Sequence, residues 1–244
     1  RQAPGDLERV NKLRVAQNMA PLDALPPKPE STEVAALPFI TLLSAKYRTT
    51  TLLSWAAFMG AFFTVYFLLS WIPRITELSG YSAEIGRNGS SLFNWGAVVG
   101  LFMVGWFTAH WNLGKVIATL YVIATISMIM FSQWNQPVAV YYILLTTIGL
   151  FQQSGNGAMY AAVTQFYDTK LKTTGIGGAI GMGRVGAVMG PAAGGFALSA
   201  GLSVETMFVL FSLPMIITAG GILTLCIMHF GKGNEVTINQ AAEA

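Results

Sequence analysis

The stretch TTGIGGAIGMGRVGAVMGPAAGG, residues 173–195, contains nine glycines, one proline and a single charged residue, Arg184. The stretch belongs to a long apolar segment that can cross a bilayer, because about 20 mostly apolar residues span the hydrocarbon core as a helix. A charge near the bilayer centre costs roughly 2.5–3.5 kcal/mol on insertion scales. Arg184 must therefore face a polar cavity or an acidic partner.

The composition of the whole chain is that of a polytopic membrane protein. Its 244 residues are 53% hydrophobic and 10% charged, with a mean hydropathy of +0.55, whereas soluble domains are about 25% charged. The single cysteine, Cys226, excludes a disulfide framework within the chain and a cysteine metal cluster. The chain begins at Arg1 and shows no signal-peptide pattern, so we expect a piece of a longer protein or a processed chain.

Charge-poor windows predict six transmembrane helices and an all-α integral membrane fold. We expect the spans at about 49–71, 89–109, 116–131, 138–166, 173–198 and 206–228. The polar sequence SQWNQP, residues 132–137, separates the third span from the fourth. An even number of spans places both ends of the domain 49–228 on the same side of the membrane.

Basic residues are distributed very unequally between the two sides. Eleven of them lie at the ends or in alternate loops, and only Arg74 and Arg87 lie in the opposite loops. The positive-inside rule therefore predicts cytoplasmic termini in the inner (plasma) membrane. We expect residues 1–48 to be a cytoplasmic region, either a short surface helix with a proline-rich linker or a disordered tail, and residues 229–244 to be a cytoplasmic tail.

Arg184 has no obvious acidic partner in the membrane, because no Asp or Glu lies within any of the six spans. A missing chain could supply one, but we favour a ligand. The guanidinium group presents a planar fork of donors that matches a carboxylate in a bidentate manner. The sequence thus predicts an anionic organic substrate.

Polar side chains in other spans are further candidates for the binding site. Gly149, Gln152, Asn156 and Tyr160 fall on one stripe of the fourth span at i, i+3, i+7 and i+11. Gln152 and Asn156 would either line a cavity or hydrogen-bond between helices. The same alternatives apply to Asn94 in the second span. Among the aromatic residues of the first span, Tyr66 is the best cavity candidate because its hydroxyl needs a partner.

The glycines of the fifth span recur every four residues. Small residues at this spacing allow helices to pack closely, and Pro191 removes one backbone hydrogen bond and favours a bend. Packing and bending are compatible, and both would serve a carrier that alternates between two states. The residues concerned are Gly186, Gly190, Pro191 and Gly194, with Gly177 and Gly181 in a second row.

Residues for enzyme chemistry are missing from the predicted spans. His110 and His229 lie at span ends, without partners at metal-ligand spacing. Ser154 lies in a span, but no histidine lies in any span to activate it. We therefore expect a protein that is not an enzyme and needs no metal, no cofactor and no nucleic acid.

Four stretches resemble one transporter family in order and spacing, across residues 44 to about 230. They are YRTTTLLSWAAFMGAFFTVYFLLSWIPRI, SLFNWGAVVGLFMVGWFTAHWNLGKVI, QSGNGAMYAAVTQFYDTKLKTTGIG and GMGRVGAVMGPAAGG. The chain resembles the carboxy-terminal six-helix half of the aromatic acid:proton symporter family, within the major facilitator superfamily. In this resemblance residues 1–48 look like the central cytoplasmic loop.

The resemblance implies proton-coupled transport of aromatic carboxylates such as hydroxybenzoates. Arg184 matches the arginine of the eleventh-helix motif G-x-G-R-x-G-A-x-x-G-P, which implies that it pairs with the substrate carboxylate. An amino-terminal six-helix half is the implied partner, and we expect it to hold the proton-carrying group. The alternatives are a carrier for another organic anion and a six-helix channel or assembly subunit, although no filter signature or ring of charge is present.

The chain departs from the family pattern in two cytoplasmic motifs. Ala109 and His110 stand where Asp and Arg are usual, while Lys115 is retained. Asp168 and Lys172 stand where Pro and Arg are usual. The resemblance implies a gating role for Lys115 and Lys172, and the departures put the strength of that gate in question.

Overall fold

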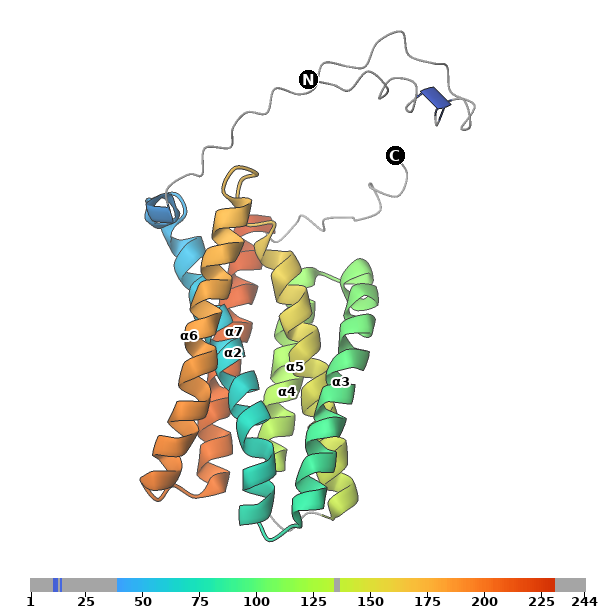
Figure 1. The fold of residues 1–244 in the computed structure, drawn as a ribbon. Helices are drawn as coiled ribbons and strands as arrows, with labels where there is room; N and C mark the ends of the chain where they lie inside the picture. The colour runs from blue at the N-terminus through green and yellow to red at the C-terminus, as the bar shows by residue number, and fades with distance from the viewer. Residues whose placement is uncertain (1–10, 13, 15–38, 134–136, 231–244) are drawn as a thin grey trace. The chain divides into compact units, whose positions relative to one another are not determined.

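Six long α-helices account for most of residues 48–230 in the computed structural model (Figure 1). They are α2 (Arg48–Leu78), α3 (Ala83–His110), α4 (Leu113–Phe131), α5 (Val138–Val163), α6 (Lys172–Ser199) and α7 (Val204–Phe230). The structure describes residues 11, 12, 14, 39–133 and 137–230. Within these residues the predicted all-α, six-helix fold is confirmed.

Several helices extend beyond the apolar windows, because a helix can continue past the hydrocarbon core where its charged residues reach water. α2 continues through Pro73 to Leu78. α3 begins at Ala83, where the Ser82 hydroxyl accepts a hydrogen bond from the backbone N–H of Ile85. Such side-chain caps satisfy amides that have no partner within the first turn.

Four of the helices, α2, α3, α4 and α7, are long and apolar enough to cross a membrane by length and composition. α5 and α6 are 26 and 28 residues long, yet they are less apolar. α5 carries three amide side chains, and α6 carries nine glycines and Arg184. α5 and α6, the two least apolar helices, therefore hold most of the polar residues that the sequence suggests for the binding site.

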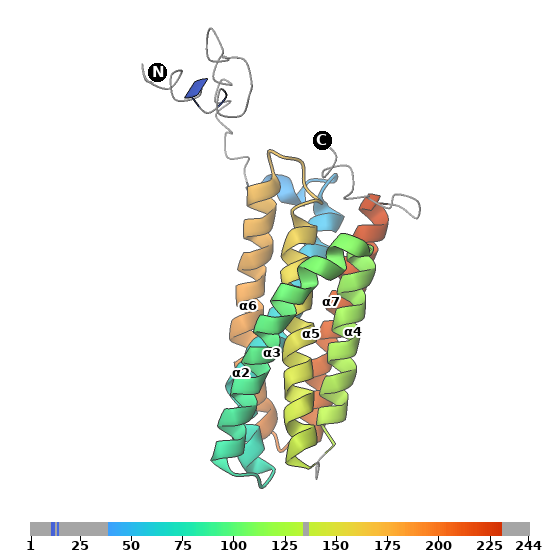
Figure 2. The same cartoon turned by 90° about the vertical axis from the view of Figure 1, so that its right-hand side faces the viewer.

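The helices form two groups of three. α2 packs along α6 and α7, while α5 packs along α3 and α4 (Figures 1 and 2). Contacts of α4 with α7, and of α2 with α3, join the two groups. Threonine hydroxyls strengthen the α2–α7 contact, since Thr218 donates to the Ala57 carbonyl at 2.9 Å and Thr64 donates to the Phe211 carbonyl at 3.0 Å.

The glycine row of α6 lies against α2. A Cβ atom added at Gly186 or Gly190 would lie 2.2 Å from the backbone oxygen of Met59 or Phe63, and one at Gly194 would meet the Trp71 ring. These positions have the close packing that their spacing predicts. Gly177 and Gly181 make no such contact among the described residues, where an added Cβ would meet no atom within 4 Å.

Pro191 lies within α6, and its backbone oxygen accepts a hydrogen bond from Trp71 Nε1 at 3.0 Å. Pro191 has no backbone N–H to donate within its own helix, but its carbonyl joins α6 to α2. Whether the helix bends at this point during transport stays a prediction.

The six-helix unit begins before the first predicted span. A short 3-10 helix, η1 (Phe39–Leu43), precedes α2. Leu42 is buried and its carbonyl accepts a hydrogen bond from Thr51, while Phe39 stacks on Trp55. Phe39 and Leu42 thus pack on the helices, and the cytoplasmic location expected for residues 1–48 stays a prediction. Of the region 1–48, where a surface helix and a linker are expected, the structure describes residues 11, 12 and 14, which are helical, and residues 39–48. The other residues of that region, and most of the predicted tail 229–244, lie outside the described residues.

Candidate functional site

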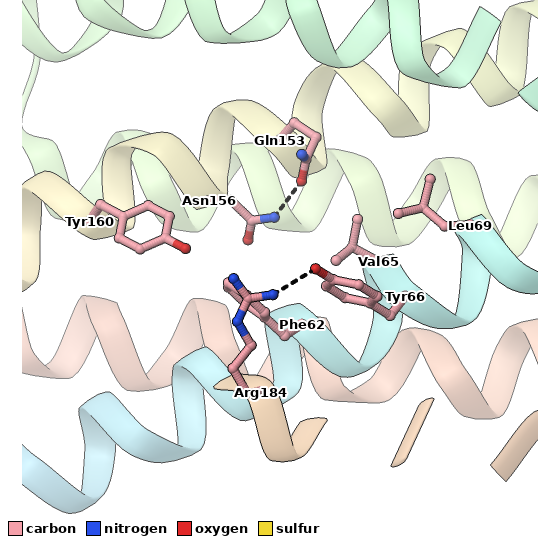
Figure 3. A pocket seen from close by; sticks show the side chains of 8 residues that line it. All are labelled: Phe62, Val65, Tyr66, Leu69, Gln153, Asn156, Tyr160 and Arg184. Carbon is pink, nitrogen blue, oxygen red and sulfur yellow. Dashed lines mark hydrogen bonds between the residues drawn. The ribbon is translucent and has the colours of Figure 1, made fainter. Parts of the chain in front are cut away.

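A cavity of about 240 Å³ lies where α2, α5 and α6 face one another (Figure 3). Helix α6 contributes one lining residue, Arg184, and the other two helices contribute the rest. The lining residues are Phe62, Val65, Tyr66 and Leu69 from α2, Gln153, Asn156 and Tyr160 from α5, and Arg184 from α6. One guanidinium group therefore shares a space with aromatic and amide side chains.

The Arg184 side chain is exposed within the described chain and is held at one of its donors. Its Nη1 donates to the Tyr66 hydroxyl at 3.0 Å, and its Cζ atom lies 5.8 Å from the centre of the Phe62 ring. Neither of the two salt bridges among the described residues involves Arg184. Since a guanidinium group has five N–H donors, most of them stay available for a ligand.

Aromatic rings form one wall of the cavity. The rings of Phe62 and Tyr66, one helical turn apart on α2, stack with centres 6.0 Å apart. Tyr160 on α5 meets the Phe62 ring edge-on at 6.5 Å. Tyr66 lines the cavity, and so does Phe62, which was not among the candidates from the sequence. Its spacing of four residues from Tyr66 is the signal that could have placed it on this wall.

Amide side chains on α5 form another part of the wall. Asn156 Nδ2 donates to Gln153 Oε1 at 2.5 Å, and Asn156 Oδ1 accepts from the Tyr121 hydroxyl on α4 at 2.6 Å. Tyr121 is fully buried and Asn156 is 7% exposed. The cavity therefore has hydrogen-bonding side chains that a second layer holds in place.

The structure places Gln152 away from this wall. Its side chain is fully buried, and its Nε2 donates to the Ala61 carbonyl of α2 at 3.5 Å. Gly149, on the same predicted stripe, packs against the Phe93 backbone of α3. Because adjacent residues in a helix point about 100° apart, Gln153 faces the cavity instead. The stripe Gln153, Asn156 and Tyr160, at i, i+3 and i+7, was the alternative pattern in the sequence.

Asn94 does not reach the cavity either. It is exposed on α3, and its Nδ2 donates to the Ser90 carbonyl of its own helix at 2.8 Å. Lys115 and Lys172 are exposed in the first turns of α4 and α6. A gating role for the two lysines stays a prediction.

Asp168 joins the α5–α6 loop to the start of α2. Lys46 Nζ lies 2.8 Å from Asp168 Oδ2, and the Tyr47 hydroxyl donates to the same oxygen. The hydrogen bonds from Lys46 and Tyr47 lower the pKa of the Asp168 carboxyl, and the hydrogen bond to Asp168 raises the pKa of the Lys46 ammonium. The residue that departs from the family motif thus makes a contact of its own. Among the described residues, no group of three His, Cys, Asp or Glu side chains could hold a metal ion.

Comparison with known proteins identifies relatives among bacterial transporters, although no family model matches the chain. The chain is 28% identical to a gallate transporter of Pseudomonas putida over 80% of its length and 43% of that protein. It is 30% identical to a 4-hydroxybenzoate transporter of Pseudomonas aeruginosa, over 76% of the chain and 41% of that protein. A gentisate transporter of Corynebacterium glutamicum is 29% identical over 74% of the chain and 40% of that protein.

The chain spans less than half the length of these curated relatives. These relatives are named as transporters, and the apolar helices of this chain indicate a multi-pass membrane protein. The resemblance stated from the motifs is confirmed: the chain is a relative of the aromatic acid transporters, consistent with the aromatic acid:proton symporter family of the major facilitator superfamily.

Proposed function

We propose that this chain is the carboxy-terminal half of a proton-coupled symporter for aromatic carboxylates such as hydroxybenzoates. It lies in the inner membrane with both ends in the cytoplasm, as the distribution of basic residues favours. The observation that carries the proposal is the Arg184 guanidinium, which lies in an aromatic-lined cavity and has no carboxylate partner among the described residues.

The two parts of the cavity match the two parts of such a substrate. Arg184 offers paired donors to a carboxylate, and the rings of Phe62, Tyr66 and Tyr160 offer flat apolar surface to an aromatic ring. This combination favours an aromatic acid over other organic anions. A Tyr66 hydroxyl already bonded to Arg184 also keeps the guanidinium directed into the cavity.

The cavity of this chain is one side of a larger site. Its volume of about 240 Å³ is below the roughly 300–1,000 Å³ of most ligand pockets. An amino-terminal six-helix half supplies the opposite wall, and substrate binds at the interface of the halves near the middle of the membrane. That half also supplies the group that carries the proton, since arginine stays protonated at physiological pH.

Substitution of Arg184 tests the proposal in the assembled transporter, with this chain co-expressed with its complementary half. Arg184→Ala removes two charge-assisted hydrogen bonds of about 1.5–3 kcal/mol each and should weaken 4-hydroxybenzoate binding by roughly 100-fold or more. Arg184→Lys keeps the positive charge but loses the planar pair of N–H donors, and it should weaken 4-hydroxybenzoate binding by roughly 10-fold.

Arg87→Ala is the matched control, because Arg87 is exposed near the start of α3 and does not line the cavity. Calorimetric titration of the purified variants gives the affinities, and their thermal unfolding checks the fold. If Arg184→Ala binds 4-hydroxybenzoate as tightly as the wild type, the carboxylate does not pair with this arginine and the proposal is wrong.

A further inference from the structure

Tyr121 is a buried tyrosine that lies behind the cavity and does not line it. Its hydroxyl oxygen is 2.6 Å from Asn156 Oδ1 and 4.0 Å from Met159 Sδ. A buried hydroxyl hydrogen needs an acceptor, and a thioether sulfur is a weak one. The phenol therefore donates to Asn156, which sets the orientation of the Asn156 amide.

The orientation of Asn156 sets that of Gln153 in turn. With Oδ1 engaged by Tyr121, Asn156 presents Nδ2 to Gln153 and donates to its Oε1 at 2.5 Å. Gln153 Oε1 is then occupied, and Gln153 Nε2 has no acceptor among the described residues. The cavity wall formed by α5 thus carries a free amide N–H₂ donor. The opposite orientation of both amides would present an oxygen acceptor instead, but it would deprive the buried phenol of its acceptor.

Resting on the proposed function, we infer that Gln153 Nε2 recognises an oxygen substituent on the ring of the bound aromatic acid. Tyr121 is then a positioning residue that keeps this donor directed to the substrate. Gln153 and Arg184 extend from different helices on the two sides of the cavity (Figure 3). Arg184 takes the carboxylate, so the amide on the other side is free to meet a ring hydroxyl, which accepts hydrogen bonds as well as donating them.

A ring without an oxygen substituent leaves this donor unpaired. Binding sites built to hydrogen-bond a substrate hydroxyl discriminate against analogues that lack it, because their own polar groups lose a partner. Gln153 is only partly buried, so water can hydrogen-bond to its unpaired Nε2 and reduce the free-energy cost. We therefore expect the wild type to bind 4-hydroxybenzoate about 10-fold more tightly than benzoate, the size of one hydrogen bond.

The test compares the affinities for 4-hydroxybenzoate and benzoate in the assembled, purified transporter. Gln153→Leu should reduce the ratio of the two affinities from about 10-fold to near one, mainly by weakening 4-hydroxybenzoate binding. Tyr121→Phe should weaken binding of 4-methoxybenzoate, whose ether oxygen only accepts, about 2-fold relative to 4-hydroxybenzoate, because both amide orientations become accessible and a phenol can pair with either one. Tyr121→Phe in the Gln153→Leu background should change neither ratio further, since the tyrosine acts through Gln153.

Tyr141→Phe is the matched control. Tyr141 is also buried, but its hydroxyl pairs with Thr76 outside the cavity, so its loss should leave both ratios unchanged. Asn156→Ala breaks the same chain of hydrogen bonds and replaces Tyr121→Phe if that variant does not fold.

The outcomes separate this inference from the proposed function. The inference is wrong if Gln153→Leu leaves the ratio of 4-hydroxybenzoate to benzoate affinity unchanged, or if adding Tyr121→Phe to Gln153→Leu changes that ratio further. The proposed function still stands in either case when benzoate binding depends on Arg184. If the wild type binds neither acid, the proposed function fails and the inference fails with it.

Discussion

Close packing of α6 on α2 makes Gly190→Ala a sharp test of the helix arrangement. A Cβ atom at residue 190 would lie 2.2 Å from the Phe63 oxygen and 3.2 Å from the Phe67 nitrogen, both backbone atoms. Ordinary contacts begin at 3.4 Å, so the methyl group is about 1.2 Å too close to the oxygen. Backbone atoms cannot rotate away as side chains do, and the two helices must therefore separate.

The energetic cost follows from that overlap. Overpacking a tight contact costs about 1–3 kcal/mol, and a clash with backbone lies at the upper end of this range. Alanine regains up to about 1 kcal/mol as a better helix former than glycine. We expect Gly190→Ala to lower the free energy of unfolding by about 2 kcal/mol.

Gly181→Ala is the control on the same helix. An added Cβ there meets no atom of the described residues within 4 Å, so only the gain in helix propensity remains, and stability should stay equal or rise by up to about 1 kcal/mol. Unfolding of this chain, purified in detergent without its complementary half and followed by circular dichroism, gives both values. Equal stability of the two alanine variants would refute the assigned packing of α6 on α2.

Two further predictions concern the loop contact and the cavity wall. The folded-state pKa of Asp168 is lowered from 3.8 and that of Lys46 is raised from 10.5, so their ion pair stabilises the fold between these two pH values. The stabilisation is lost as the pH falls through the lowered pKa of Asp168, and it is lost as the pH rises through the raised pKa of Lys46. Asp168→Asn should therefore flatten the pH dependence of thermal unfolding below pH 5, and an unchanged profile would contradict the contact. In a Cys226→Ser background, a cysteine at 153 should react with a water-soluble maleimide and be protected by 4-hydroxybenzoate, while one at 152 should not react. The reverse pattern would show that α5 is rotated from its described position.

Several features could be predicted from the sequence because their cause is local. The cost of burying charge in lipid limits Asp, Glu, Lys and Arg to the ends of apolar windows, so the six helices could be read directly from the chain. The same cost makes Arg184 conspicuous and directs it to a cavity. The four-residue spacing of Gly186, Gly190 and Gly194 predicts a packing face, although it does not name the partner helix.

Only the tertiary structure decided which side of each helix meets which neighbour. Gln152 and Gln153 are adjacent amides of the same type, and the rotation of α5 against α2 buries the first and turns the second to the cavity. The rotation of α5 depends on the packing of whole helices, so it cannot be predicted from any single residue of α5. The same holds for contacts between distant segments. Tyr121 and Asn156 are 35 residues apart, and Lys46 and Asp168 are 122 apart. Each pair meets because the bundle brings its helix ends and faces together, so the polarity of the cavity wall is a property of the assembled helices rather than of any local pattern.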